Sequence, residues 1–445
     1  MTKDKKMLLI FPPQWTPIAP HFAMASLMGQ LKNKGYNASC LDLNIEFYQK
    51  ILTKKYLEFA CEKIKKEYVE LFNQLRKIHQ RRQQGAEFSL EEQCEIYKFG
   101  KIKEIVSKNE NFYQKIPNSI ENAVAEVKSE EVFYEPKKLI SSMNIIDQSL
   151  KIISAAYSPT NITFDSSYNP FLKFNFESID YFVFDKKSNI FWDFLKDEVL
   201  KIKEKKFDFV AISLNSSSQI VAGLTLGFLL KKYTKAHVNI GGNFFGRVKD
   251  EILNRPEFSK FCDSISIEEG EGPIVDVARF VNSEIRIEEV SNFVYFKNNK
   301  VYETKKMSPL KQNDMENLNL DDYNLEKYFA PKIVMPFQTS RGCYWGKCTF
   351  CDQDFGMEFN VKSIDKVISQ MSELKEKYGI THYEFIDESV SPMYLKDLSK
   401  KLLETNINPS FFCDARLETA FNEEIFELAS KAGLKNDVVG LGIGF

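Results

Sequence analysis

Three cysteines that lie close together in the sequence have the clearest chemical potential. Cys343, Cys348 and Cys351 fall within nine consecutive positions. Three thiolates on one loop can bind three irons of a [4Fe-4S] cluster and leave the fourth iron open, as a catalytic centre requires. The alternative is a structural zinc site closed by a fourth ligand, for which Cys413 and His382 are the candidates. We therefore expect a metal centre at these cysteines.

The segments around the cysteines predict a partial barrel. Residues 333–445 alternate apolar strand patterns with amphipathic helix patterns. Strands are expected over 334–339, 382–386, 410–412 and 438–445, and helices over 363–378, 392–404 and 423–432. Repeated strand–helix units form a barrel whose site lies at the carboxyl ends of the strands. These units make up only part of a barrel, and an open barrel edge favours a second chain that completes it.

An earlier part of the chain predicts an α/β fold with a doubly wound parallel sheet. Continuous apolar runs alternate with helix patterns, as in the strand expected over 7–11 and the helix expected over 22–33. Ligands of such sheets bind outside the carboxyl ends of the strands. Several polar or glycine residues follow the predicted strands and are expected at this edge: Asn215, Ser216, Gly241 and Gly242.

The sequence divides into four regions. Residues 1–45 and 206–285 are expected to form the α/β domain, and residues 333–445 the partial barrel. Residues 46–205 are first rich in Lys and Glu, with aliphatic residues at helical spacing, and then become aromatic and irregular. This pattern predicts a helical and irregular insertion. A hairpin and a linker are expected over 286–332.

The cysteine segment resembles the cluster-binding loop of the radical S-adenosylmethionine superfamily. In that family three cysteines hold a [4Fe-4S] cluster, and an aromatic residue just before the third cysteine packs against the adenine of S-adenosylmethionine. Phe350 occupies that position here. The family usually has three residues between the first two cysteines, whereas this chain has four, from Tyr344 to Lys347. This longer spacing resembles that of some peptide-modifying members of the family. The difference therefore affects which subgroup the chain resembles, more than the chemistry that the cysteines imply.

The resemblance also implies a mechanism and further cofactor contacts. An electron donor such as flavodoxin or ferredoxin would reduce the cluster, which cleaves S-adenosylmethionine to methionine and a 5′-deoxyadenosyl radical. Asp387 and Glu388 follow the second barrel strand, where the family binds the ammonium and ribose groups of the cofactor. Arg416 follows the third and is expected to pair with the cofactor carboxylate. The alternative for each is an ordinary salt bridge at the rim.

Loop motifs of the first sheet resemble the cobalamin-binding domain that precedes the barrel in many of these enzymes. The motifs are Phe11-Pro12-Pro13, Asp42-Leu43-Asn44, Gly241-Gly242 and Glu269-Gly270-Glu271-Gly272. The resemblance implies that Asn215, Ser216, Gly241 and Gly242 approach the corrin or its nucleotide tail. Other cobalamin domains supply an axial histidine from an Asp-x-His-x-x-Gly signature, and positions 42–45 contain no histidine. Cobalamin is therefore expected to bind without one; the alternative is a scaffold that has lost the cofactor.

These features predict a cobalamin-dependent radical S-adenosylmethionine enzyme that transfers a methyl group to an unactivated carbon of a small molecule or peptide. The alternatives are a peptide-modifying radical enzyme without cobalamin, and a non-catalytic iron–sulfur or zinc protein with a truncated barrel. Lys plus Arg number 60 and Asp plus Glu 62, which favours neither nucleic acid nor a membrane surface as partner. With no signal-peptide pattern and no run long enough to span a bilayer, a cytoplasmic location is expected.

Overall fold

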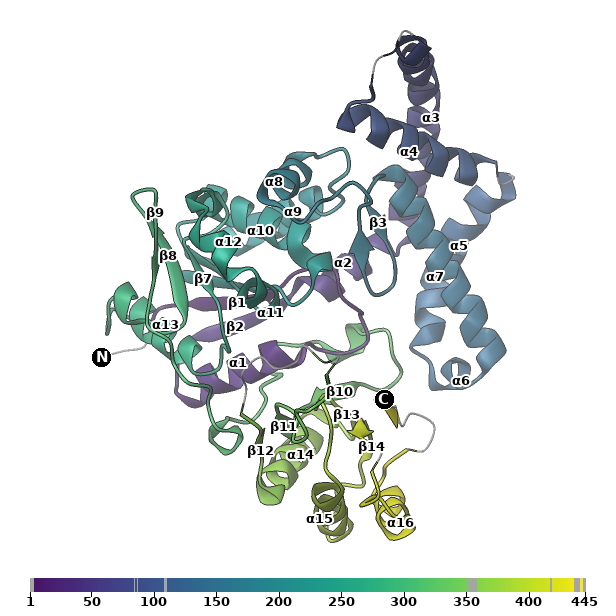
Figure 1. Ribbon diagram of the computed structural model, residues 1–445. Coiled ribbons are helices and arrows are strands. Elements are labelled where there is room, and N and C mark those ends of the chain that lie inside the picture. Colours follow the sequence, from purple (N-terminus) through teal and green to yellow (C-terminus); the bar gives the residue numbers. More distant parts are fainter. Residues whose placement is uncertain are drawn as a thin grey trace.

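The computed structural model describes residues 4–83, 85, 87–107, 110–349, 351, 358–416, 418–435 and 441–442. Its largest element is a seven-stranded sheet in the order β2-β1-β5-β6-β7-β8-β9 (Figure 1). Its strands are β1 (Met7–Phe11), β2 (Ala38–Asp42), β5 (Phe209–Ser213), β6 (His237–Gly241), β7 (Ser264–Ser266), β8 (Phe293–Lys297) and β9 (Lys300–Glu303). Pairing is parallel from β2 to β7 and antiparallel from β7 to β9. The predicted α/β fold with a mostly parallel sheet is confirmed.

Helices cover both faces of this sheet, because its strands are apolar on both faces. In β1, Leu8 and Ile10 belong to one buried core, and Met7, Leu9 and Phe11 belong to the other. The first core is closed by α8 (Phe176–Phe184), α9 (Trp192–Lys205) and α10 (Ile220–Tyr233), and the second by α1 (Phe22–Asn33) and α13 (Pro273–Val281). Two short helices, α11 (Asn243–Arg247) and α12 (Lys249–Leu253), connect β6 to β7.

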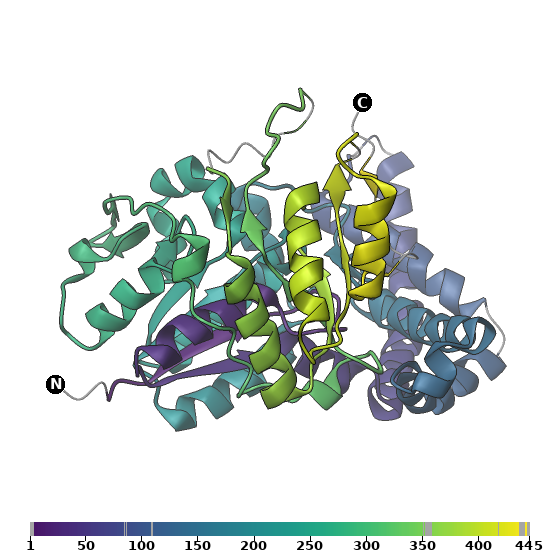
Figure 2. The ribbon, with the colours of Figure 1, turned by 90° about the horizontal axis from the view of Figure 1, so that it is seen from below.

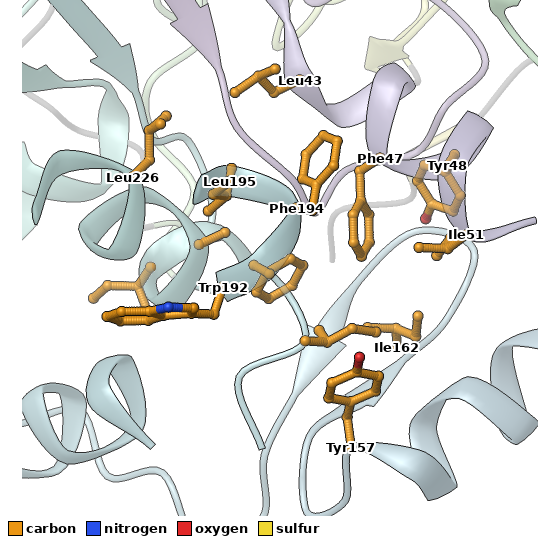
Figure 3. Close-up of a cluster of buried hydrophobic side chains, with 14 of the residues drawn as sticks. Leu43, Phe47, Tyr48, Ile51, Tyr157, Ile162, Trp192, Phe194, Leu195 and Leu226 are labelled. Carbon is orange, nitrogen blue, oxygen red and sulfur yellow. The ribbon is translucent and has the colours of Figure 1, made fainter. Parts of the chain in front are cut away.

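The inserted region is largely helical, as the sequence predicts. It contains α2 (Leu43–Ile51), α3 (Lys54–Gln83), α4 (Leu90–Val106), α5 (Glu110–Val127), α6 (Glu130–Phe133) and α7 (Pro136–Ala156), with the short strands β3 (Asn161–Ile162) and β4 (Ser167–Tyr168). Phe47 and Tyr48 of α2 share one buried cluster with Ile162 and with Phe194 of α9 (Figure 3). The insertion is therefore continuous with the core of the sheet. Among the described residues, no helix has the length and apolarity needed to cross a bilayer.

The last part of the chain forms a second, smaller parallel sheet in the order β10-β13-β14. Its strands are β10 (Val334–Phe337), β13 (His382–Phe385) and β14 (Ser410–Cys413), and its helices α14 (Ile364–Tyr378), α15 (Pro392–Leu403) and α16 (Glu423–Lys431) lie side by side (Figure 2). Two separate two-stranded sheets follow its strands: β11 (Ser340–Arg341) with β12 (Asn360–Val361), and β15 (Ala415–Arg416) with β16 (Leu441–Gly442). The strand expected over 438–445 lies largely outside the described residues.

Helix α1 packs against both sheets (Figure 1). Met28 belongs to the core beneath the large sheet, whereas Phe22 belongs to the core of the small sheet together with Phe337. Gly29 permits the close approach of the linker that connects the sheets, because a Cβ atom there would lie 2.0 Å from the carbonyl oxygen of Asn317. The two sheets are therefore joined through a shared helix.

The large sheet extends beyond the expected domain boundary. The hairpin β8–β9, which we expected to belong to the linker over 286–332, pairs with β7 and makes β9 an edge strand. Helices α8 and α9, which we expected in the insertion, cover the sheet instead. The other edge is covered by the linker, since the carboxylate of Asp322 accepts a hydrogen bond from the N–H of Cys40 in β2 (2.8 Å). A strand pattern shows that a strand exists but not which sheet it joins.

Candidate functional site

The cysteine loop, which runs from β11 to β12 (residues 342–359), begins beside the buried carboxylate of Asp387. Phe337 of β10 pairs in register with Phe385 of β13, so Thr339 and Asp387, two positions later, face each other. The carboxylate accepts hydrogen bonds from the N–H and hydroxyl of Thr339 (both 3.0 Å) and from the N–H and hydroxyl (2.7 Å) of Ser340. Burial raises the pKa of Asp387, and these hydrogen bonds oppose the rise. Asp387 thus holds the backbone that leads into the loop.

Arg341, two residues before the first cysteine, joins the cysteine loop to the large sheet. Its guanidinium donates to Glu271 (2.7 Å) and to Glu269, both in the loop after β7. We call residues 268–272 the glutamate loop. Burial alone would raise the pKa of Glu271, but the charge of Arg341 and the hydrogen bonds from Arg341, the backbone and Ser26 together hold this pKa below its usual value. Glu271 also accepts a hydrogen bond from Ser26 of α1 (3.3 Å).

The four residues between the first two cysteines are anchored at the end of the third strand of the small sheet. The guanidinium of Arg416 lies 3.8 Å from the centre of the Trp345 ring and pairs with the carboxylate of Glu418. The hydroxyl of Tyr344 donates to the same carboxylate (2.9 Å). The cation–π contact with Arg416 and the hydrogen bond to Glu418 therefore fix Trp345 and Tyr344, which lie in the four-residue gap between the first two cysteines.

A buried lysine lies behind the cysteine loop. Lys362, directly after β12, is 3% exposed, and its ammonium donates to the carbonyl of Gln338 (2.6 Å) and to the side chain of Gln370 (3.0 Å). Burial lowers the pKa of Lys362 to about 7, because the charged form loses its hydration. Its backbone N–H donates to Thr339 (2.8 Å), which ties the end of the loop to its beginning.

The three loop cysteines are not buried, whereas four of the other five described thiols are; Cys94 is the exception. Cys343 and Cys348 are half-buried and Cys351 is exposed, and none forms a disulfide. Three accessible thiols on one loop are a donor set that suits an iron–sulfur cluster. Among the described residues, no three His, Cys, Asp or Glu side chains are already arranged around a metal position. The trio shares a loop without converging on one point.

The fourth ligands considered for a zinc site do not complete one. His382 begins β13 and pairs with Val334, so it lies at the amino end of the strands, opposite the cysteine loop. Cys413 is 2% exposed and packs in the core of the small sheet, where burial raises the pKa of its thiol to about 12. Within the described part of the chain, neither side chain joins the three cysteines.

A cavity of about 460 Å³ lies between the large sheet and the residues that lead into the cysteine loop. Its walls come from the carboxyl ends of β5, β6 and β7, from α1 and from the glutamate loop, and Gln338, Arg341 and Glu388 line it from the small sheet. The volume falls in the range of small-molecule and cofactor sites. No histidine is among the described residues that line it. The sequence predicts a ligand site at the carboxyl ends of the parallel strands, and the structure has a cavity there.

The predicted cavity residues have different positions. Asn215, Gly241 and Gly242 line the cavity. Ser216 does not line it; its hydroxyl instead accepts a hydrogen bond from the N–H of Ser218 and caps a short 3-10 turn. Gly242 has φ +105°, and a Cβ atom there would lie 2.2 Å from the carbonyl oxygen of Leu214, so only glycine fits this wall.

The residues predicted to bind S-adenosylmethionine are also divided. Glu388 is exposed and faces the cavity. Asp387 is buried against Thr339 and Ser340, and Arg416 is engaged by Trp345 and Glu418, so both side chains position the loop in this structure. Phe350 lies outside the described residues.

Sequence reasoning missed the partners that hold the loop. It assigned no role to Arg341, Lys362, Trp345 or Glu418, although Arg341 directly precedes the Gly342-Cys343 pair. That proximity was an available signal, because Arg341 is a charged residue two positions before the first candidate ligand. Lys362 carried no comparable signal, because its burial depends on how α14 packs on β10.

No protein-family model matches this chain. One curated protein, the uncharacterized methyltransferase PH0819 of Pyrococcus horikoshii, is 29% identical over 143 residues, which is 30% of this chain and 30% of that protein. Among solved structures, the radical S-adenosylmethionine methyltransferase TsrM of Kitasatospora setae, with tryptophan substrate and an S-adenosylmethionine analogue bound, aligns with a TM-score of 0.52 at 12% identity. The alignment covers 97% of this chain and 58% of TsrM.

TsrM with cobalamin and a [4Fe-4S] cluster bound aligns with a TM-score of 0.50 at 12% identity, over 96% of this chain and 57% of that one. At this level of identity the alignments show that the chain shares the fold of TsrM. This chain spans less than two thirds of the length of each of these proteins.

Proposed function

We propose that this chain is a cobalamin-dependent radical S-adenosylmethionine enzyme that transfers a methyl group to an unactivated carbon of a small molecule or a peptide. The observation that carries the proposal is the position of the cavity. The carboxyl ends of β5 to β7 line one side of it, and Arg341 and Glu388, from the edge that bears the cysteine loop, line the other. A methyl carrier held by the sheet would therefore face the place where S-adenosylmethionine is activated.

The cysteine loop fits a cluster by its donor chemistry. Cys343, Cys348 and Cys351 would hold three irons, and the fourth would remain open for S-adenosylmethionine. Asp387 holds Thr339, ahead of the first cysteine, and Arg416 contacts Trp345, between the first and second cysteines. Their proposed role is to position the loop, and Glu388, exposed in the cavity, is the remaining carboxylate proposed to contact the cofactor.

The cavity fits a large, amide-rich cofactor by the character of its walls. An apolar floor that includes Leu9 and Ile212 is bordered by the polar side chains of Asn215 and Asn239. Gly241 and Gly242 bring backbone rather than side chains to the wall. When bound, cobalamin supplies a cobalt centre that carries the methyl group, and the [4Fe-4S] cluster supplies the electron that cleaves S-adenosylmethionine. The cavity residues support binding without a histidine ligand.

An anaerobic reconstitution tests this proposal. The protein is loaded with iron, sulfide and hydroxocobalamin, reduced with dithionite and incubated with S-adenosylmethionine. We expect 5′-deoxyadenosine or S-adenosylhomocysteine to form, and corrin absorbance to remain after gel filtration. The Cys343→Ala variant should lose bound iron and product. Cys94→Ala is the matched control, because Cys94 is a half-buried thiol of the helical insertion and should retain both.

The outcomes separate the alternatives. Absence of both nucleoside products from an iron-loaded protein would overturn the catalytic proposal. Product formation with no retained corrin would favour a radical enzyme without cobalamin. Tightly retained zinc in place of iron would support a structural metal site.

A further inference from the structure

Three nearly buried charged side chains connect the cavity to the cysteine loop. Arg341 has 14% of its side chain exposed, Glu269 has 15% and Glu271 has 7%. Arg341 donates to Glu271 through both terminal nitrogens (2.7 and 3.4 Å), to Glu269 through one of them, and to Gln338 through Nε (3.0 Å). Ion pairs removed from water in this way are held more rigidly and screened less than surface pairs.

This ion-pair network connects the segment that carries the first cysteine with the wall of the cavity. Arg341 precedes Gly342 and Cys343 in the chain, so displacement of its backbone moves the first cysteine. Glu269 and Glu271 line the cavity, as does Arg341 itself. The same side chains therefore form a wall of the cavity and an anchor of the cysteine loop.

The two carboxylates of the network are not equivalent. Glu271 is held by Arg341 and by Ser26 of α1. One oxygen of Glu269 pairs with Arg341, while its Oε1 is buried and has no hydrogen-bond partner among the described residues. A buried acceptor without a donor costs free energy, so Glu269 gains from any rearrangement that supplies one. Glu271 is the fixed partner, and Glu269 is the one that can adjust.

We propose that Arg341, Glu269 and Glu271 couple the occupation of the cavity to the position of the cysteine loop. A ligand whose amide groups fill the cavity orders the glutamate loop, which fixes Arg341 and with it the first cysteine. Conversely, metal held by the cysteines fixes Arg341 and preorganises the cavity wall. Such coupling is reciprocal, because each ligand changes the affinity of the other by the same factor. The inference rests on the proposed function, in that the two ligands are a corrinoid and an iron–sulfur cluster.

Absorbance titration with hydroxocobalamin measures this coupling without any turnover. The dissociation constant is determined for the full chain before and after reconstitution of the cluster. Coupling between sites changes affinities roughly 5- to 150-fold, so we expect cobalamin to bind at least about fivefold more tightly once the cluster is present. Arg341→Gln should reduce this factor to below about twofold.

Two further variants make the test specific. Glu269→Gln leaves the two hydrogen bonds between Arg341 and Glu271 in place. It therefore still folds if Arg341→Gln does not. This variant should weaken the coupling in part. Arg286→Gln is the matched control, because Arg286 forms an exposed ion pair with Glu289 and neither residue lines the cavity. This variant should keep the wild-type factor.

The failures of the two proposals are distinguishable. If the wild type binds cobalamin equally well with and without the cluster, the coupling is refuted while the proposed function stands. An unchanged factor in both Arg341→Gln and Glu269→Gln also refutes it, because the coupling then runs through other contacts. If the wild type binds no cobalamin, the cobalamin part of the proposed function falls and the coupling falls with it.

Discussion

Lys362 carries an ammonium group into the protein interior behind the cysteine loop. Because burial lowers its pKa to about 7, the folded protein loses this proton as pH rises through about 7, whereas an unfolded chain loses it only as pH rises through about 10.4. Between these values the unfolded state binds more protons, so the free energy of unfolding rises with pH. The pH-dependent part of the free energy of unfolding that Lys362 contributes is therefore fully present above about pH 10.4. It is lost as pH falls from there to about 7.

We expect Lys362→Met to flatten this dependence. The difference in the free energy of unfolding between wild type and variant should increase from pH 7 to pH 9.5, by at most about 1.4 kcal/mol per pH unit. Urea denaturation at a series of pH values measures it. Lys400→Met, at an exposed position of α15, is the control and should show no such trend. A constant difference for Lys362→Met would show that its ammonium stays charged when folded.

Asp387 is the second residue with a sharp expected effect. Asp387→Ala leaves the buried donors of Thr339 and Ser340 without an acceptor, which should lower the free energy of unfolding by about 1–3 kcal/mol. Asp387→Asn keeps one acceptor oxygen and should recover part of the loss. Thermal and urea unfolding measure both variants. Asp147→Asn, in an exposed pair with Lys151, should change little, and equal stability of the two Asp387 variants would contradict the hydrogen-bond argument.

The cysteine loop is the element that depends most on side-chain anchors. Its flanking strands β11 and β12 are only two residues long each, so backbone pairing alone holds it weakly. Trp345 and Arg416 supply a cation–π contact on the opposite side. Loss of this contact should loosen the loop before any other part of the small sheet.

A double-mutant cycle tests this anchor. We expect Arg416→Ala and Trp345→Leu to show a coupling energy of about 0.5–2 kcal/mol in urea denaturation, and each variant to retain less iron after reconstitution. The comparison is a cation–π contact in the helical insertion, where the guanidinium carbon of Arg82 lies 4.7 Å from the centre of the Phe88 ring. Arg82→Ala should leave iron retention unchanged. Additive effects of the two loop variants would mean that the contact contributes no stability.

The elements themselves were largely predictable, and their contacts were not. Apolar runs and a following glycine locate β1 and α1 at the bounds that the structure has, because local pattern determines where a strand or helix begins and ends. The cysteines were also predictable, since residue type and spacing carry their chemistry. The pairing of Arg341 with Glu271, and of Asp387 with Ser340, depends on strand register and on the packing of two sheets. A single sequence does not encode such long-range contacts in any local pattern.

For the whole molecule, the shared helix α1 predicts cooperative unfolding. Because Phe22 packs in one core and Met28 in the other, neither sheet can unfold without exposing part of the other's core. The chain has three tryptophans, of which Trp192 belongs to the core of the large sheet and Trp345 to the cysteine loop. Urea unfolding of the wild type should therefore give the same midpoint by tryptophan fluorescence and by far-ultraviolet circular dichroism. Two separate midpoints would show that the small sheet unfolds independently.

The edge strand β9 has a consequence for how the protein behaves at high concentration. An open strand edge is a template for strand addition between molecules, which leads to aggregation. Here the edge carries Lys300 and Glu303, and Glu303 pairs with Lys249 of α12. A neighbouring molecule that added a strand at this edge would have to strip water from these charges. Concentrated solutions of the protein should therefore resist fibril formation at this edge, and replacement of Lys300 and Glu303 by valine should promote it.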